Sequence, residues 1–264
     1  METNAQISKS HNPVLNKLRL NDKSRVKKVI GVLSGKGGVG KSFVSSSLAV
    51  HAAKLGKRVA ILDADITGAS IPKSFGIHEN ALQSDGLILP AITKSGIQIM
   101  SVGLLLENET DPVIWRGPVI SGVMSQFYTD VYWNDVDIMF VDMPPGTGDV
   151  TLTAFQSFPL DGIIIVSSPG DLVSLIVEKQ VNMAKKMNMK ILGLIENMSY
   201  FITPDTRKKY EIFGKSRLNE FSEKLQISAL GSLPIDPKAK ELVDAGRIED
   251  YYNIDIEKIV KKII

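Results

Sequence analysis

Short apolar runs alternate with stretches of helical periodicity along most of this chain. Continuous apolar segments of this length are typical of strands that are buried on both faces of a parallel sheet. They occupy residues 29–34, 58–65, 96–103, 136–146, 161–168, 190–197 and 227–234. Helical spacing of apolar residues occupies 41–55, 119–131 and 171–188. Strands that alternate with helices predict an α/β fold, a three-layer sandwich in which helices flank both faces of a mostly parallel sheet.

The two ends of the chain depart from this alternation. Residues 1–28 are polar and basic, which predicts a mobile or loosely docked arm, with a docking role for a partner as the alternative. Residues 29–250 form the predicted α/β domain. Residues 251–264 place four isoleucine and valine side chains on one helical face. We expect this amphipathic helix to pack on the body, and a basic helix lying on an anionic membrane is the alternative.

Composition argues against some kinds of binding partner and cofactor. The 264 residues suffice for one large domain, and a net charge of +2 does not favour a nucleic-acid partner. The chain contains no cysteine, which excludes disulfides and thiolate metal sites. No apolar run approaches the ~20 residues that cross a bilayer, and the first residues lack the apolar stretch of a signal peptide. We therefore expect a cytoplasmic protein that does not bind a membrane.

A glycine-rich segment, GKGGVGKS, follows the first predicted strand and opens the first predicted helix. This is the setting that a phosphate-binding P-loop requires, because its glycines let successive backbone N–H groups point at phosphate oxygens. The helix N-terminus adds partial positive charge. Lys41 is expected to reach the β- and γ-phosphates of a nucleotide, and Ser42 to bind Mg²⁺. The predicted nucleotide-binding residues here are Gly35, Lys36, Gly37, Gly38, Val39, Gly40, Lys41 and Ser42.

Acidic residues at two strand ends complete the predicted phosphate site. Asp142 ends the run DIMFVD and is expected to hold Mg²⁺, directly or through a water molecule. Of Asp63 and Asp65, which end the second strand, we prefer Asp65 as the residue that orients the attacking water. The glycine-punctuated loop 144–149 follows Asp142 and could move when the γ-phosphate leaves. No N-K-x-D guanine signature is present, which favours ATP. Slow, Mg²⁺-dependent ATP hydrolysis with Lys36, Lys41 and Asp65 as catalytic residues is the predicted activity.

The motifs GKGGVGKS, LDADITGASIP, IWRGP, VDMPPGTGD, IENMSYF and LPID occur in this order. With them the chain resembles the deviant-Walker P-loop ATPases, and within these the Mrp/ApbC group of ATP-dependent iron–sulfur cluster carriers. The resemblance runs from about Val29 to about Gly246. It implies a homodimer in which Lys36 reaches the nucleotide of the partner subunit. It also implies that Asn197 contacts the adenine and that the loop from Pro234 to Asp236 closes over it.

One motif departs from the family pattern. Where the family carries C-P-x-C, with two cysteines from each subunit binding one bridging cluster, this chain has Thr203-Pro204-Asp205-Thr206. Threonine hydroxyls are weak ligands for cluster iron, which thiolates normally bind. We therefore predict that the chain does not hold a cluster in the family's way. It could act in cluster assembly beside a cysteine-bearing paralogue or an iron–sulfur client protein, or as a nucleotide-gated positioning or regulatory switch without a metal role.

Overall fold

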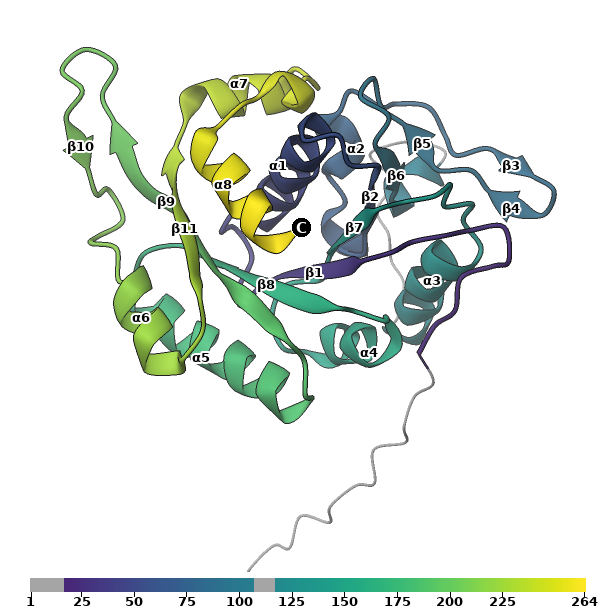
Figure 1. The fold of residues 1–264 in the computed structure, drawn as a ribbon, viewed down its shortest axis with the longest axis horizontal. Helices are drawn as coiled ribbons and strands as arrows, with labels where there is room; N and C mark the ends of the chain where they lie inside the picture. Colours follow the sequence, from purple (N-terminus) through teal and green to yellow (C-terminus); the bar gives the residue numbers. More distant parts are fainter. Residues whose placement is uncertain (1–16, 107–116) are drawn as a thin grey trace, which may run out of the picture.

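The computed structural model describes residues 17–106 and 117–264, which form a twisted sheet with helices on both of its faces (Figure 1). The strands are β1 (Val29–Ser34), β2 (Val59–Asp63), β3 (Gln83–Ser84), β4 (Leu87–Ile88), β5 (Ala91–Ile92), β6 (Gln98–Met100), β7 (Ile138–Asp142), β8 (Gly162–Ser167), β9 (Ile191–Ile202), β10 (Lys209–Tyr210) and β11 (Ala229–Ile235). The helices are α1 (Lys41–Lys54), α2 (Ile71–Ser74), α3 (Gly117–Thr129), α4 (Asp149–Ser157), α5 (Asp171–Lys186), α6 (Leu218–Leu225), α7 (Pro237–Asp244) and α8 (Ile254–Ile263).

The sheet brings the predicted phosphate site together at one edge. Its strand order is β10-β9-β8-β1-β7-β2-β6-β5, and β11 also pairs with β9. The pairs β1–β7, β1–β8, β2–β7 and β8–β9 are all parallel. Two pairs are antiparallel, β5 with β6 and β10 with β9. The prediction of a mostly parallel α/β sheet is confirmed. Because parallel strands end at the same edge, the loops after β1, β2 and β7 lie next to one another there.

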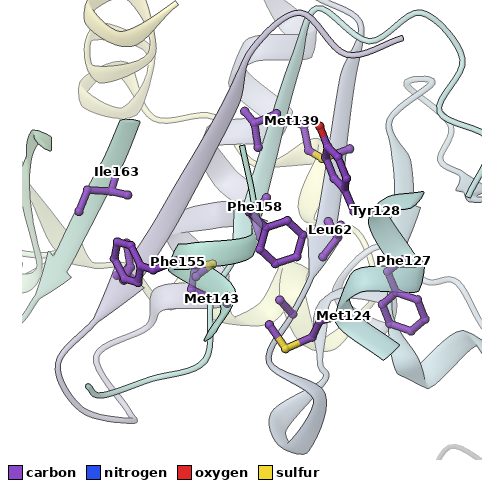
Figure 2. Close-up of a cluster of buried hydrophobic side chains, with 14 of the residues drawn as sticks. Leu62, Met124, Phe127, Tyr128, Met139, Met143, Phe155, Phe158 and Ile163 are labelled. Carbon is purple, nitrogen blue, oxygen red and sulfur yellow. The ribbon is translucent and has the colours of Figure 1, made fainter. Parts of the chain in front are cut away.

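Apolar side chains form one core on each face of the sheet. The first lies between the sheet and helices α3, α4, α5 and α6, where aromatic and methionine side chains from α3, α4 and β7 meet (Figure 2). The second lies between the sheet and helices α1, α2, α7 and α8. Burying one large apolar side chain contributes about 1.5–3 kcal/mol to the stability of the fold. Together the two layers therefore hold the strands, and with them the strand ends, in place.

Helix α8 belongs to the second core. Its residues Ile256, Ile259, Val260 and Ile263 are buried, and the helix packs on α1 and β11. Asn253 caps its N-terminus by accepting hydrogen bonds from the backbone N–H groups of Asp255 and Ile256. The apolar face that could have entered a membrane is therefore covered by the body. Within the two described ranges, no helix is both long enough and apolar enough to span a bilayer.

We predicted that the basic N-terminal segment is a mobile or loosely docked arm. From residue 17 onward, its side chains are instead hydrogen-bonded to the body. Lys17 Nζ donates to the backbone oxygens of Phe155 and Phe158, at 3.0 and 2.8 Å, where α4 ends. Asn21 Nδ2 donates to Thr129 O and Val131 O at 2.8 and 2.9 Å. Polar side chains hold this segment in place because they satisfy carbonyl groups that helix ends leave without partners. Residues 1–16 of the predicted arm lie outside the described residues.

Candidate nucleotide-binding site

The P-loop links β1 to α1 and depends on glycine for its shape. Gly38 and Gly40 have φ angles of 82° and 78°, in the left-handed region that side chains disfavour. A Cβ atom on Gly40 would also come within 2.3 Å of Asn197 Nδ2. The loop borders a cavity of about 480 Å³, lined among others by Gly37, Gly38, Gly40, Lys41 and Ser42. The loop thus has the curl and the open space that phosphate groups need.

Lys41 lies at the base of this cavity and is only 5% exposed. Its Nζ is 2.8 Å from Asp142 Oδ2 and 3.4 Å from Asp65 Oδ2. Burial lowers the pKa of Lys41, but the charges of Asp142 and Asp65 outweigh burial and leave the pKa raised. The lysine therefore stays charged, and its ammonium group is available to bind another anion at the same place.

Asp142 is fully buried at the end of β7 and accepts two further hydrogen bonds. Ser42 Oγ donates to one of its oxygens and Ser45 Oγ to the other, both at 2.6 Å. A serine hydroxyl next to a carboxylate forms a pair of hard oxygen ligands, which is the donor type that Mg²⁺ prefers. The residues present therefore fit the magnesium ion that the fold implies. Ser45 was missed by the sequence analysis, although its position three residues after Ser42 places it on the same face of α1.

Asp63, the last residue of β2, and Asp65, two residues later, have different surroundings. Asp63 lies opposite Asp142 in the sheet register and accepts a hydrogen bond from Ser101 Oγ at 3.0 Å. Burial, followed by the charge of Asp142, raises the pKa of Asp63 to about 7. Asp65 instead lines the cavity. The structure thus places Asp65, which we preferred from the sequence, within reach of a bound phosphate, and its catalytic role stays a prediction.

The other predicted elements of the phosphate site lie around its rim. Lys36 is exposed on the outer part of the loop, and its role toward a partner subunit stays a prediction. The loop after Asp142 contacts the P-loop through the backbone, since Gly146 N donates to Ser34 O at 2.8 Å. This hydrogen bond links the loop 144–149, which could respond to the γ-phosphate, to Ser34, the residue immediately before the P-loop. Of the motif IWRGP, the first three residues lie outside the described residues.

A second cavity of about 510 Å³ adjoins the P-loop and contains the residues expected at the adenine. Asn197, Pro234 and Asp236 line it. Asn197 Nδ2 donates to Val39 O at 3.0 Å, which ties the middle of β9 to the P-loop. The Asp236 side chain caps α7 through Lys238 N and accepts from the Tyr251 hydroxyl, both at 3.0 Å. Sequence analysis missed several residues of this cavity, among them Phe43, Met198, Phe213, Pro237 and Lys240.

The T-P-D-T segment forms the tip of the hairpin that joins β9 to β10, which projects beyond the sheet (Figure 1). The hydroxyl oxygens of Thr203 and Thr206 are 2.6 Å apart and share a hydrogen bond. Thr203 Oγ1 also accepts from Lys208 N at 3.1 Å, and Asp205 Oδ1 accepts from Thr206 N at 2.7 Å. The polar groups of the turn therefore satisfy one another. Across residues 17–106 and 117–264, no cluster of three or more histidine, cysteine or acidic side chains is arranged to bind a metal.

Comparison with known proteins identifies the family. A model described as the NUBPL iron-transfer P-loop NTPase matches residues 25–264. An iron–sulfur cluster carrier protein of Clostridium perfringens is 47% identical over 234 residues, which cover 86% of this chain and 82% of the relative. A protein of the same description from Methanocaldococcus jannaschii is 45% identical over 247 residues, covering 91% and 85%. The chain belongs to the NUBPL/Mrp-type family of iron–sulfur cluster carrier P-loop NTPases. The resemblance drawn from the motifs is confirmed.

Solved structures extend the comparison to the fold. A nucleotide-binding protein of Archaeoglobus fulgidus, in complex with ADP, is 39% identical, with a TM-score of 0.77 and coverage of 88% of this chain and 90% of that protein. The cell division ATPase MinD of Pyrococcus furiosus, at 18% identity, has a TM-score of 0.66 and coverage of 89% and 98%. The second likeness shows a shared fold. A protein of similar structure that is 39% identical to this chain thus binds ADP.

Proposed function

We propose that this chain is a Mg²⁺-dependent ATP-hydrolysing homodimer of the NUBPL/Mrp-type family. The observation that carries the proposal is the group formed by Lys41, Ser42 and Asp142 under the P-loop, with Asp65 on the cavity wall. These are the residue types that phosphoryl transfer requires, because its catalysis rests on positioning and charge stabilisation. The exposed position of Lys36 supports a role toward the nucleotide of a second subunit.

Each residue has a defined task in this proposal. Lys41 exchanges its ion pair with Asp142 for the β- and γ-phosphates of ATP. Ser42 and Asp142, freed of Lys41, would hold Mg²⁺, which neutralises phosphate charge when it is bound. Asp65 accepts a hydrogen bond from the attacking water and orients it toward the γ-phosphate. Lys36 of each subunit stabilises the charge that develops on the transferred group in the other subunit.

We further propose that the chain does not bind a thiolate-ligated cluster. The sequence has no cysteine, and the hydroxyl groups of Thr203 and Thr206 bond each other in the turn that corresponds to the family's ligand motif. Hydroxyl groups are poor ligands for the iron of such clusters. The chain would then act in cluster assembly without carrying the cluster, paired with a cysteine-bearing paralogue or with an iron–sulfur client.

The same turn favours a second candidate function. A P-loop ATPase without cargo ligands could act as a nucleotide-gated switch that positions or regulates another protein. The two candidates differ in the partner, since the first needs a protein that holds a cluster and the second does not. Cross-linking under ATP in cell extract, followed by identification of the captured proteins, separates them: recovery of an iron–sulfur protein supports the first candidate.

The catalytic part is tested by ATP turnover. We expect phosphate release that requires Mg²⁺, stops on chelation and rises more than linearly with protein concentration in the range where the dimer forms. Turnover that is independent of Mg²⁺, or strictly proportional to protein concentration across the monomer–dimer range, would contradict the proposal.

The cargo part is tested by anaerobic reconstitution with iron and sulfide, followed by counts of iron and labile sulfide after desalting. We expect no retained iron in the wild type. The double variant Thr203→Cys/Thr206→Cys serves as the matched positive control, because it restores both thiolates at the hairpin tip. A stoichiometric cluster in the wild type would overturn the ligand argument and assign the chain a carrier role through other ligands.

A further inference from the structure

The strand β9 is distorted at the point where it passes the P-loop. Its pairing with β11 shifts register, so that Glu196 lies opposite Ser232 while Tyr200 lies opposite Pro234. Three residues of β9 thus face one residue of β11. Within this bulge Met198 has a φ angle of 55°, which residues other than glycine rarely adopt. Such local strain persists only where the surrounding structure enforces it, and it is concentrated at functional sites.

The bulge directs side chains from β9 toward the P-loop. A Cβ atom on Gly40 would lie 3.4 Å from Met198 Cε and 2.3 Å from Asn197 Nδ2. Both side chains line the 510 Å³ cavity. Gly40, Phe43 and Val243 line this cavity and the phosphate cavity alike. The two cavities therefore adjoin, and a ligand with its phosphates on the P-loop can extend into the second one.

The hairpin that β9 opens returns to the same cavity. After β10 ends at Tyr210, the chain brings Phe213 to the cavity, which residues of β11 and α7 also line. Phe213 is 53% exposed, although an aromatic ring gains about 25 cal/mol for each Å² that it removes from water. Its neighbour Ile212 is equally exposed, at 57%, but does not line the cavity. The Phe213 ring thus borders the cavity, and about half of the residue's surface is exposed to solvent.

We propose that Phe213 forms one wall of the base site and that nucleotide binding thereby fixes the hairpin carrying the T-P-D-T turn. This inference rests on the proposed ATP-binding function. The face of a purine stacks on an aromatic ring regardless of its hydrogen-bonding edge, and the proline, valine and methionine side chains of this cavity suit its apolar surface. A bound base covers the exposed ring and completes its packing.

The covalent path from the ring to the turn is short. Phe213 follows Tyr210 by three residues, and Tyr210 pairs with Phe201 at the start of the hairpin. Met198, which also lines the cavity, precedes Phe201 by three residues. A base that contacts both Phe213 and Met198 is therefore linked to both strands of the hairpin at its root. Nucleotide occupancy consequently sets the position of the tip that carries the T-P-D-T turn.

Calorimetric titration with ADP and Mg²⁺ tests the contact. We compare the wild type with Phe213→Ala, with Phe213→Tyr, which keeps the ring, and with Ile212→Ala as the matched exposed control. We expect Phe213→Ala to weaken ADP binding by about tenfold, and the other two variants to bind within about twofold of the wild type. Equal affinity of Phe213→Ala and the wild type overturns the inference and leaves the proposed function intact.

Hydrogen exchange tests the coupling. In the wild type and in Ile212→Ala, saturating ADP should slow exchange of the backbone amides in residues 201–210. In Phe213→Ala, ADP at a concentration that also saturates this variant should leave those amides unchanged while still protecting the P-loop. Protection of the hairpin in Phe213→Ala would overturn the coupling. A wild type that binds no ADP, and so protects neither segment, would contradict the proposed function itself.

Discussion

The P-loop site and the hairpin turn each place two hydroxyl groups beside a carboxylate, but in opposite surroundings. Ser42 and Ser45 donate to Asp142, which is fully buried and paired with the ammonium group of Lys41. In the turn, the two threonine hydroxyls bond each other beside Asp205, which is exposed to solvent. The first group is a buried, charged arrangement next to a cavity, whereas the second is exposed and is closed by its own hydrogen bonds.

Burial accounts for the difference between these two groups. In a low-dielectric interior, a carboxylate is retained only with a cation and hydrogen-bond donors, so the P-loop site tolerates few changes. At the exposed tip, water replaces any lost hydrogen bond, so a turn can exchange cysteine for threonine without loss of the fold. The side chains of the tip can therefore change while the buried nucleotide site stays intact.

The largest expected effect comes from removing the cation of the buried group. Lys41→Ala should abolish detectable ADP binding and ATP turnover, because it removes the phosphate ligand. It should also lower the free energy of unfolding by about 3–5 kcal/mol, since Asp142 would stay buried without its partner. Calorimetry and urea unfolding measure the two losses. Lys54→Ala, at the far end of α1, is the control. Retained ADP binding in Lys41→Ala would contradict the placement of the phosphates.

The next effect concerns the exposed lysine of the P-loop. Lys36→Ala should leave ADP affinity within about twofold but lower ATP turnover by roughly 10³-fold, because a cation supplied in trans acts on the transition state. Turnover measured at saturating ATP, with Lys57→Ala as the control for an exposed lysine near α1, checks the split between binding and rate. Hydrolysis at the wild-type rate in Lys36→Ala would show that no charge from a second subunit takes part.

The sequence was sufficient to predict the parts of the site that lie at strand ends. Gly35 to Ser42 follow a buried strand and open a helix. Asp142 ends a second strand and Asp65 lies just after a third, so the parallel sheet brings these segments together. The same rule also predicted the fold, because each central strand is a short apolar run buried on both faces.

Other parts depend on contacts between distant segments, and no local pattern reveals them. The extension of β9 to Ile202 was missed because the polar residues Glu196 and Asn197 end its first apolar run. Phe213 lines the base cavity only because the hairpin returns to the P-loop. The docking of residues 17–28 rests on side-chain bonds to carbonyl groups more than 100 residues away, such as those of Lys17 and Asn21. Periodicity carries no information on such pairings.

A smaller effect separates the two serines that bind Asp142. Ser42 lines the phosphate cavity and Ser45 does not, although both donate at 2.6 Å. Ser42→Ala should therefore weaken Mg²⁺-dependent ADP binding by about tenfold, while Ser45→Ala should lower the free energy of unfolding by about 1–3 kcal/mol with unchanged Mg²⁺ dependence. Titrations at several Mg²⁺ concentrations, paired with urea unfolding, measure both. Equal Mg²⁺ dependence in the two variants would remove Ser42 from the magnesium site.

The smallest effect is a pH dependence that should occur at the buried acids and not at the turn. The folded protein keeps the Asp63 proton up to about pH 7, whereas the unfolded chain releases it near 3.8. Unfolding between these values releases a proton, so this group makes stability fall as pH rises. Asp63→Asn, which mimics the protonated acid, should remove a fall of about 1 kcal/mol between pH 6 and 7. Hydrogen bonds, first from Thr206 N, lower the pKa of Asp205, so its contribution is already constant there. Urea unfolding should therefore give Asp205→Asn the same pH slope as the wild type. A slope unchanged in Asp63→Asn would mean that another group of the buried site binds the proton.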